Sequence, residues 1–352
     1  MAPFPDDLGL DTLRYYYDDK EVRKLFQRYK LIPKKPKNQQ IICPTCGTGR
    51  LGTEKRNDNV VGWRYRCLNR ECKKVIAPTK NTFFSQGHLS LYESLAIFMY
   101  YVQNCSLKLV IQNMHLGTEA AVNYYNFCKE ICMWQFRKMM KDDGPIGGKG
   151  LHVEIDECYI RRKGNKGRLT KMEERQWKIF GGLCAETGQY FAFLVPKCTK
   201  KVLWRIIRDW IRPGSIIHSD GAAVYNELSG EEGKQFGIKI MGHEVVVHRT
   251  GQYVAESDLE PGHQITTNRI ENLWKYAKRH ISGQGTKKSV KKDLYKYLYF
   301  RQYLNQLDKP ADRLNIFLKH VGNFFSLPLE EEKERNYPQY IVKISRKIEY
   351  KL

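Results

Sequence analysis

Three acidic residues in the second half of the chain have surroundings that suit metal-dependent chemistry. Asp156 and Asp220 each follow a short apolar run that predicts a strand, and Glu271 lies in residues 268–278, whose pattern predicts a helix. Carboxylate oxygens are the ligands that Mg²⁺ and Mn²⁺ prefer. We therefore predict that Asp156, Asp220 and Glu271 are catalytic and bind two Mg²⁺ (or Mn²⁺) ions. For any one of these acids taken alone, a solvated surface carboxylate is the alternative.

The charge of the chain points to a polyanionic substrate. Lys and Arg number 60 against 38 Asp and Glu, which gives a formal net charge of +22. Such an excess predicts attraction to nucleic acid or to an anionic membrane, with a merely basic surface as the alternative. Two divalent ions about 3.5–4 Å apart support in-line displacement at phosphorus. Together, the acids and the charge favour metal-dependent chemistry on a polyanion.

Alternation along the strand that contains Asp156 sorts its side chains onto two faces. Val153 and Ile155 point toward a core, whereas His152, Glu154 and Asp156 point the other way. We expect Asp156 to end this strand, where a sheet opens to solvent. A structural role is the favoured interpretation for Glu154 and for Glu157.

Four cysteines form two pairs with a spacing typical of zinc ligands: Cys43, Cys46, Cys67 and Cys72. Four thiolates leave no open coordination position, so they predict one structural Zn²⁺ in a zinc ribbon. Between the pairs, Arg64 and Arg66 lie on an alternating segment that predicts a strand. We expect these basic residues to contact DNA, with docking of another protein as the alternative role of the ribbon.

The longest apolar stretch, near residues 95–102, is too short to cross a membrane. The N-terminal residues lack the basic start and apolar run of a signal peptide. We therefore expect an intracellular protein with no membrane partner, located in the nucleus if the source is eukaryotic and otherwise in the cytoplasm or nucleoid.

The elements that position these residues change in type along the chain. Ser90, Ser106 and Thr118 each start a predicted helix, and three short helices fit a helix-turn-helix-like domain or an ordinary helical spacer. Gly and Pro in residues 142–150 predict a boundary. After it, strands, a hairpin and helices predict an α/β sandwich around a mixed sheet.

The predicted fold class is multidomain α+β, in five segments. They are an N-terminal helix and basic linker (1–40), the zinc ribbon (41–78), the helical helix-turn-helix-like DNA-binding domain (85–145), the α/β catalytic domain (150–306), and a C-terminal helix and tail (307–352).

From residue 151 to about 306, the chain resembles the catalytic domain of DDE transposases of the Merlin family and their bacterial insertion-sequence relatives. The matching pieces are residues 156–160, 180–182, 218–221, 247–248, 263–274 and 297–301. The zinc ribbon and the helical segment before them also resemble the layout of that family.

This resemblance implies an RNase H-like fold for the catalytic domain. It also implies terminal-inverted-repeat DNA as substrate, cut-and-paste movement, and catalytic acids at Asp156, Asp220 and Glu271. Some bacterial relatives have no acid at the third position. We assign it to Glu271 because Lys278 follows at the expected distance; Asn268 is then expected to support the metal ligands.

The remaining polar residues of the resemblance are expected to act around the acids. Lys278 is expected to contact DNA phosphate, with a solvated helix lysine as the alternative. His248 and His263 orient either the scissile phosphate or the metal ligands, or else are hydrogen-bonded structural histidines.

The predicted function is therefore that of a DNA transposase that cuts at the ends of an element by two-metal-ion hydrolysis and joins the 3′-OH to target DNA. A homodimer is expected, because two ends must be held in one complex. The alternatives are a host-adopted zinc-ribbon DNA-binding protein and an RNase H-like structure-specific nuclease.

Overall fold

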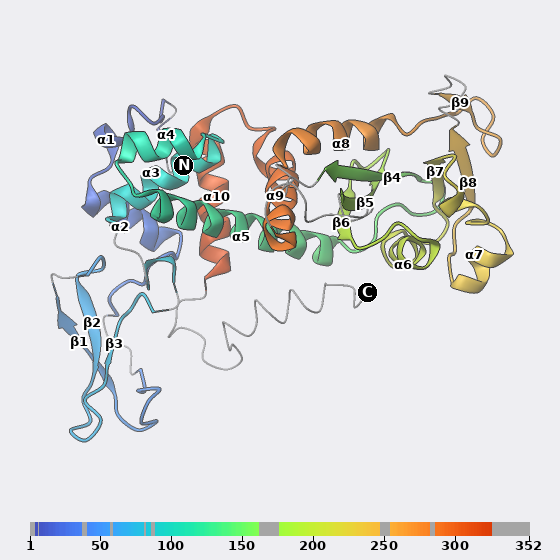
Figure 1. Cartoon of the computed structure of the whole chain (residues 1–352). Coiled ribbons are helices and arrows are strands. Elements are labelled where there is room, and N and C mark those ends of the chain that lie inside the picture. The colour runs from blue at the N-terminus through green and yellow to red at the C-terminus, as the bar shows by residue number, and fades with distance from the viewer. Residues whose placement is uncertain are drawn as a thin grey trace, which may run out of the picture. The chain divides into compact units, whose positions relative to one another are not determined.

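The structure is a computed structural model. In it, the chain folds into two compact units (Figure 1). Unit 1 comprises Met1–Gln135 and Tyr299–Lys351, and unit 2 comprises Phe136–Leu298. The residues described are 4–5, 7–36, 41–56, 59–80, 82–85, 89–161, 176–246, 254–281 and 286–325.

Unit 1 is mainly helical. Its elements are α1 (Leu13–Tyr16), α2 (Asp19–Arg28), η1 (Phe83–Ser85), α3 (Leu91–Val102), α4 (Leu107–Met114), most of α5 (Thr118–Asp143), the π-helical η5 (Phe300–Leu304) and α10 (Pro310–Phe324). Aromatic rings form its core: Phe98 lies 5.6 Å from Phe317, and Tyr101 lies 5.4 Å from Phe317 and 5.7 Å from Phe300, between ring centroids. Helices α3 and α10, which are far apart in the sequence, therefore share one core.

Side-chain caps set several helix starts in unit 1. Ser90 and Glu93 form a capping box at the start of α3, and the Ser106 hydroxyl accepts from the Leu109 N–H at the start of α4. The structure thus confirms the two caps predicted from sequence. The single N-terminal helix predicted within residues 1–40 is instead two helices, because Asp18 accepts from the Glu21 N–H and caps the start of α2.

Unit 1 also contains a three-stranded antiparallel sheet. The strands are β1 (Leu51–Lys55), β2 (Trp63–Cys67) and β3 (Val75–Ile76), in the order β1-β2-β3. Burial alternates along β2, where Trp63, Tyr65 and Cys67 are buried, as the sequence pattern predicts.

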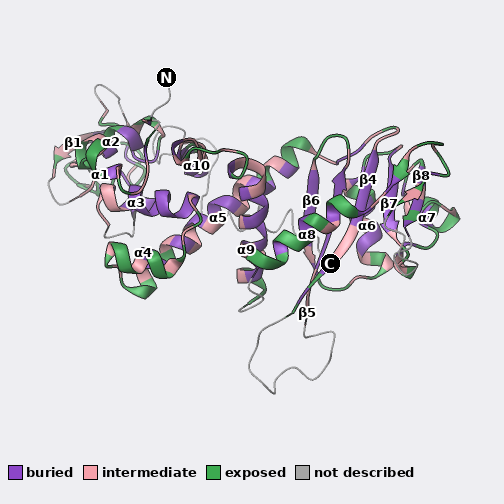
Figure 2. Cartoon of the chain, turned by 90° about the horizontal axis from the view of Figure 1, so that it is seen from above, coloured by how far each residue is buried: buried purple, intermediate pink, exposed green. Residues whose placement is uncertain are grey.

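Unit 2 is built on a five-stranded mixed sheet, as predicted, in the order β6-β5-β4-β7-β8. The strands are β4 (His152–Arg161), β5 (Gln176–Cys184), β6 (Tyr190–Val195), β7 (Ile216–Asp220) and β8 (Gly242–Val246). β4, β5 and β6 run antiparallel, whereas β4, β7 and β8 run parallel. The strands are largely buried, with exposed residues along α8 beside them (Figure 2).

The other elements of unit 2 are α6 (Lys200–Trp210), η3 (Ala223–Tyr225), α7 (Glu231–Phe236), β9 (Ala255–Glu256), β10 (Gln264–Ile265), α8 (Asn268–His280) and α9 (Lys287–Tyr299). The last residue of α9, Tyr299, belongs to unit 1. After β7, the chain forms the short 3₁₀ turn η3 and then α7.

Two helices cover opposite faces of the sheet in unit 2. A Cβ at Gly181 would lie 2.7 Å from the Trp274 ring of α8, so this glycine lets α8 approach β5 closely. The Trp210 ring of α6 packs instead against Phe191 and Phe193 of β6, at 6.2 and 5.2 Å between ring centroids. Phe191 pairs with Gly182, the next residue along β5, so α6 lies on the other face.

Among the described residues, no helix combines the length and the apolar character needed to cross a membrane.

Candidate active site and metal centres

The register between β4 and β7, extended two residues past its last pair, sets Asp156 opposite Asp220, and Asp220 acts on the Asp156 charge. The pairs run in parallel from His152 with Ile216 to Glu154 with His218, a constant offset of 64 residues (218 − 154 = 64). The same offset puts Asp220 beside Asp156 (156 + 64 = 220). Strands lie about 4.8 Å apart and residues in register point to one face. The two acids are therefore neighbours on one face of the sheet.

The expectation that Asp156 ends its strand is wrong. β4 continues to Arg161, because β5 pairs with it as far as Arg161 with Gln176. It is β7 that ends at Asp220. Beyond Glu154, β4 has no further pairs with β7 among the described residues. Asp156 therefore lies where the edge of β4 that faces β7 becomes unpaired.

Glu154 attaches the start of α8 to β4. This fully buried carboxylate accepts from the backbone N–H groups of Arg269 and Ile270 and from the Arg269 guanidinium, each at 2.9 Å. The positive end of a helix favours such an anion. Because Glu154 and Asp156 share a face of β4, Glu271 in the first turn of α8 lies on the same side of the sheet as both aspartates.

The three predicted acids are close enough to repel one another electrostatically. Burial, together with repulsion from Glu157, Asp220 and Glu271, raises the pKa of Asp156 to about 8. The Thr267 hydroxyl donates to Glu271 Oε1 at 2.7 Å. Backbone N–H groups hold one oxygen of each aspartate, that of Glu157 for Asp156 at 2.8 Å and that of Ala222 for Asp220 at 3.1 Å. Crowded carboxylates of this kind fit hard divalent cations.

The acids are close but do not form a closed ligand set. In the part of the chain that the structure describes, they are not among the groups whose ligand atoms all lie within 4.8 Å of one another. Glu157 adds a further carboxylate nearby; burial raises its pKa, Asp220 adds repulsion, and the Tyr225 hydroxyl donates to it at 2.7 Å. The sequence favoured a structural role for Glu157, and this bond to Tyr225 is of that kind.

The polar residues predicted around the acids lie in different settings. Asn268 is exposed at the start of α8 and donates its N–H to Thr266 Oγ1. Lys278 is exposed on the same helix. Burial raises the pKa of Cys158 on β4, and the positive charge of Lys278 lowers it in part. His248 and the C-terminal tail lie outside the described residues.

His263 lies against another histidine rather than among the acids. Its ring stacks on His152 with centroids 4.0 Å apart and planes 12° apart. His152 in turn contacts His218, with 3.0 Å between Nδ1 and Nε2. Sequence analysis did not predict this cluster, although strand alternation put His152 on the Asp156 face and would have placed His218 on the Asp220 face.

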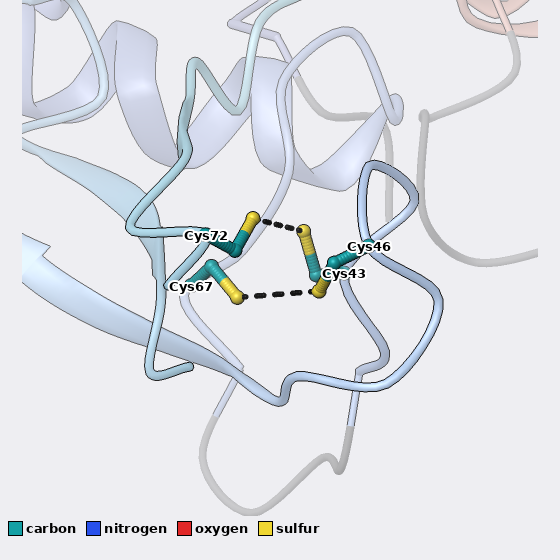
Figure 3. A group of neighbouring side chains, drawn as sticks. All are labelled: Cys43, Cys46, Cys67 and Cys72. Atoms are coloured by element: carbon teal, nitrogen blue, oxygen red, sulfur yellow. Dashed lines mark hydrogen bonds between the residues drawn. The ribbon is translucent and has the colours of Figure 1, made fainter. Parts of the chain in front are cut away.

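The four predicted zinc ligands of unit 1 come together (Figure 3). The Sγ atoms of Cys43 and Cys72 lie 3.9 Å apart, and those of Cys46 and Cys67 lie 3.8 Å apart. Sulfurs about 2.3 Å from a tetrahedral Zn²⁺ are separated by about 3.8 Å, so the thiols fit the ion. A Cβ at Gly49 would lie 2.4 Å from Cys67 Sγ, which makes glycine necessary beside the cluster.

Arg64 and Arg66 are paired with an acid on the neighbouring strand. Arg64 Nε lies 2.6 Å from Glu54 Oε2, and Arg66 Nη1 lies 2.9 Å from Glu54 Oε1. The Arg66 side chain is 47% exposed. Surface pairs of this kind contribute little to stability, so Arg66 remains accessible to a phosphate.

The segment that carries the acids matches a family of known proteins. Residues 146–307 match the ISXO2-like transposase domain. This match supports a relationship to DDE transposases for unit 2, and the finer assignment to the Merlin family stays a prediction. No curated protein matches the chain.

Among solved structures, the chain is similar to a chain in the cryoEM structure of the simian T-cell lymphotropic virus intasome in complex with PP2A regulatory subunit B56 gamma. The identity is 11%, the match covers 69% of this chain and 76% of that chain, and the TM-score is 0.25. With a TM-score this low, the likeness establishes neither fold nor function.

Proposed function

We propose that this protein is a DNA transposase that cleaves DNA at the ends of an element and joins the freed 3′-OH to target DNA. The observation that carries the proposal is the parallel register that sets Asp156 beside Asp220, within the segment that matches the transposase domain. Glu271 joins them from α8, which Glu154 attaches to the same face.

The acids act as a divalent metal site in this proposal. Bound Mg²⁺ or Mn²⁺ supplies charge neutralisation at the scissile phosphate and lowers the pKa of the attacking water or hydroxyl. Asp156, Asp220 and Glu271 would hold the ions, and the mutual repulsion of the three carboxylates favours cation binding. Lys278 contributes a positive charge on α8 for the DNA backbone, and Asn268 supports the ligands from the helix start.

Unit 1 supplies DNA recognition in this proposal. A zinc ribbon with a half-exposed Arg66 and helices α3, α4 and α5 offer surfaces for the element ends. Three residues separate α4 from α5, which is typical of a helix-turn-helix. A homodimer would hold two ends together.

Cleavage of labelled terminal-inverted-repeat DNA in the presence of Mg²⁺ tests the proposal. We expect cutting by the full chain and a loss of at least 100-fold in Asp156→Ala, Asp220→Ala and Glu271→Ala, because each removes a metal ligand. Asn226→Ala, a change at the end of η3 that leaves the acids intact, serves as the control. Cutting that survives in the three acid variants would reject the site.

A second reaction separates a transposase from a nuclease. Full-length protein incubated with a pre-cut element end and a circular plasmid should produce joined products that depend on the same three acids. Cleavage without joining would indicate a structure-specific nuclease. Specific DNA binding without either reaction would indicate a DNA-binding protein of another function.

A further inference from the structure

Unit 2 contains a second cluster of metal-ligand atoms, separate from the acids and from the cysteines. It comprises His152 on β4, His218 on β7 and Glu244 on β8, whose ligand atoms all lie within 4.8 Å of one another. All three residues are buried, with exposed fractions of 3%, 2% and 7%. His218 and Glu244 are paired in the parallel register, so the sheet itself brings them together.

Distances within the cluster match the edges of a coordination shell. His152 Nδ1 lies 3.0 Å from His218 Nε2, and His218 Nε2 lies 3.4 Å from Glu244 Oε2. Ligand atoms about 2.0–2.1 Å from a tetrahedral Zn²⁺ are about 3.3 Å apart. Two of the three distances thus already match the spacing that one ion requires, and the third, between His152 and Glu244, is within 4.8 Å.

Both histidines have polar contacts outside the cluster that can take up their ring protons. His152 directs its other nitrogen, Nε2, toward Glu260 Oε2 at 3.3 Å, and His218 hydrogen-bonds the Thr266 backbone. Each neutral imidazole carries one N–H, and the tautomers that fit a bound cation place both protons on these outer contacts. Two nitrogen lone pairs and one carboxylate oxygen then face one another.

Only one of the two carboxylate oxygens of Glu244 accepts hydrogen bonds from the part of the chain that the structure describes. Its Oε1 accepts from the Ser257 hydroxyl at 2.7 Å and from the Asp258 N–H at 2.9 Å. Its buried Oε2 has no hydrogen-bond partner among the described residues. A buried carboxylate oxygen without a partner is costly, and a cation between it and the two histidines removes that cost.

We propose that His152, His218 and Glu244 bind a structural Zn²⁺ in unit 2. Imidazole and carboxylate ligands suit this ion. Glu260 and Ser257 orient the ligands from outside, in the way that carboxylates and hydroxyls support metal-bound histidines and acids. The ion would join β4, β7 and β8 to residues 257–263, and it does not depend on the proposed DNA cleavage.

Zinc content of the purified full-length protein tests this site. After growth with added zinc and desalting, elemental analysis should find about two zinc ions per chain, one in the cysteine site and one in the cluster. Glu244→Gln and His152→Gln should each lower the ratio to about one. His243→Gln, a histidine beside Glu244 that contacts Ser219 instead, and Asp156→Asn should leave it at two.

A variant outside the ligand set controls for the possibility that ligand substitutions simply cause misfolding. Glu260 is 40% exposed, so Glu260→Gln should fold and keep all ligands while its zinc affinity falls about 10–100-fold, measured by competition with a chelator. A ratio of one zinc in the wild type, unchanged in folded Glu244→Gln, would overturn the proposal. Loss of the second zinc in Asp156→Asn but not in Glu244→Gln would place that ion at the acids instead.

Discussion

Glu154 is the residue that connects the sheet to the helix of the third acid. Its three hydrogen bonds all go to the first turn of α8, and none of its surface is exposed. Burial raises its pKa, while the Ile270 N–H and the Arg269 side chain oppose that rise. Glu154 is therefore a positioning residue, since it touches the start of α8 rather than the substrate.

Replacing Glu154 should cost both stability and activity. Glu154→Ala leaves the N–H groups of Arg269 and Ile270 without an acceptor, and each buried unsatisfied donor costs about 1–3 kcal/mol. Glu154→Gln retains one carbonyl acceptor and should lose less. Thermal unfolding and Mg²⁺-dependent cleavage measure the two effects, with exposed Glu256→Gln as control. Equal losses in the Ala and Gln variants would contradict this role.

Asp156 should make the stability of the metal-free protein depend on pH. Its folded-state pKa of about 8 lies above the ordinary value of 3.8, so the folded state binds more protons between these values. Its contribution to the free energy of unfolding therefore falls as pH rises from about 4 to about 8. In buffer without added divalent cations, Asp156→Asn should gain Tm relative to wild type over this range.

Added Mg²⁺ should reverse the order at pH 8. It stabilises the wild type by binding the ionised acids, whereas Asp156→Asn has lost a ligand and should respond much less. A wild-type Tm that rises with pH relative to the variant without divalent cations would show that Asp156 is not buried near other acids.

At the scale of elements, the close packing of α8 on β5 depends on one glycine. A Cβ at Gly181 would lie 2.6 Å from the Phe191 carbonyl oxygen and 2.7 Å from the Trp274 ring. Neither contact relaxes without moving backbone or helix. Gly181 is also paired with Asp156, so a shift of α8 at this point changes the distance between Glu271 and the aspartates.

Gly181→Ala should therefore destabilise unit 2 by about 1–3 kcal/mol through overpacking. Cleavage activity should fall further than the loss of folded protein explains, because α8 carries Glu271. Gly117→Ala, where a Cβ has open space, is the matched control. Chemical unfolding and activity per folded molecule measure the two effects, and an unchanged unfolding midpoint would rule out the close approach.

Local signals in the sequence predicted most elements. Ser90 and Ser106 cap helices as their spacing indicates, and alternation correctly placed Glu154 on the face opposite the core positions Val153 and Ile155. What the sequence did not predict depends on partners far along the chain. The extension of β4 to Arg161 requires β5, and the contact of Glu154 with Arg269 of α8 joins residues 115 positions apart.

In the candidate site, too, some features follow from local sequence and others depend on residues far apart in the chain. Residue types predicted the three acids and the four cysteines as metal ligands, and the structure brings the cysteines within ligand distance. The grouping of His152, His218 and Glu244 arises from the parallel register of three strands, which no local pattern encodes. Roles for Asp156, Asp220 and Glu271 remain predictions for the cleavage assay.

At the scale of the molecule, unit 1 contains a metal centre of its own. Cys46→Ser removes one thiolate and should abolish zinc binding by the ribbon, which depends on the ion for its small core. We expect weaker binding to element-end DNA in a gel-shift assay. Cys198→Ser, at a partly buried cysteine of unit 2, should leave zinc content and binding unchanged. Full DNA affinity in zinc-free Cys46→Ser would exclude the ribbon from recognition.

The charge of +22 predicts that DNA affinity falls steeply with salt. Arg66→Ala should reduce the slope of log K against log salt concentration by about one if Arg66 contacts a phosphate. Arg208→Ala on α6, at a similarly exposed arginine paired with Asp209, provides the comparison. Equal slopes for wild type and Arg66→Ala would remove Arg66 from the DNA interface.

Glu154, His218 and Glu244 form one row across three parallel strands. Each of these side chains depends on a neighbour in the next strand or helix, so a change at one position alters what the adjacent position can tolerate. Substitutions in this row should therefore be non-additive in double-mutant cycles. During divergence, a lineage that replaces the histidine should tend to replace the glutamate beside it as well, so the row would be inherited as a unit.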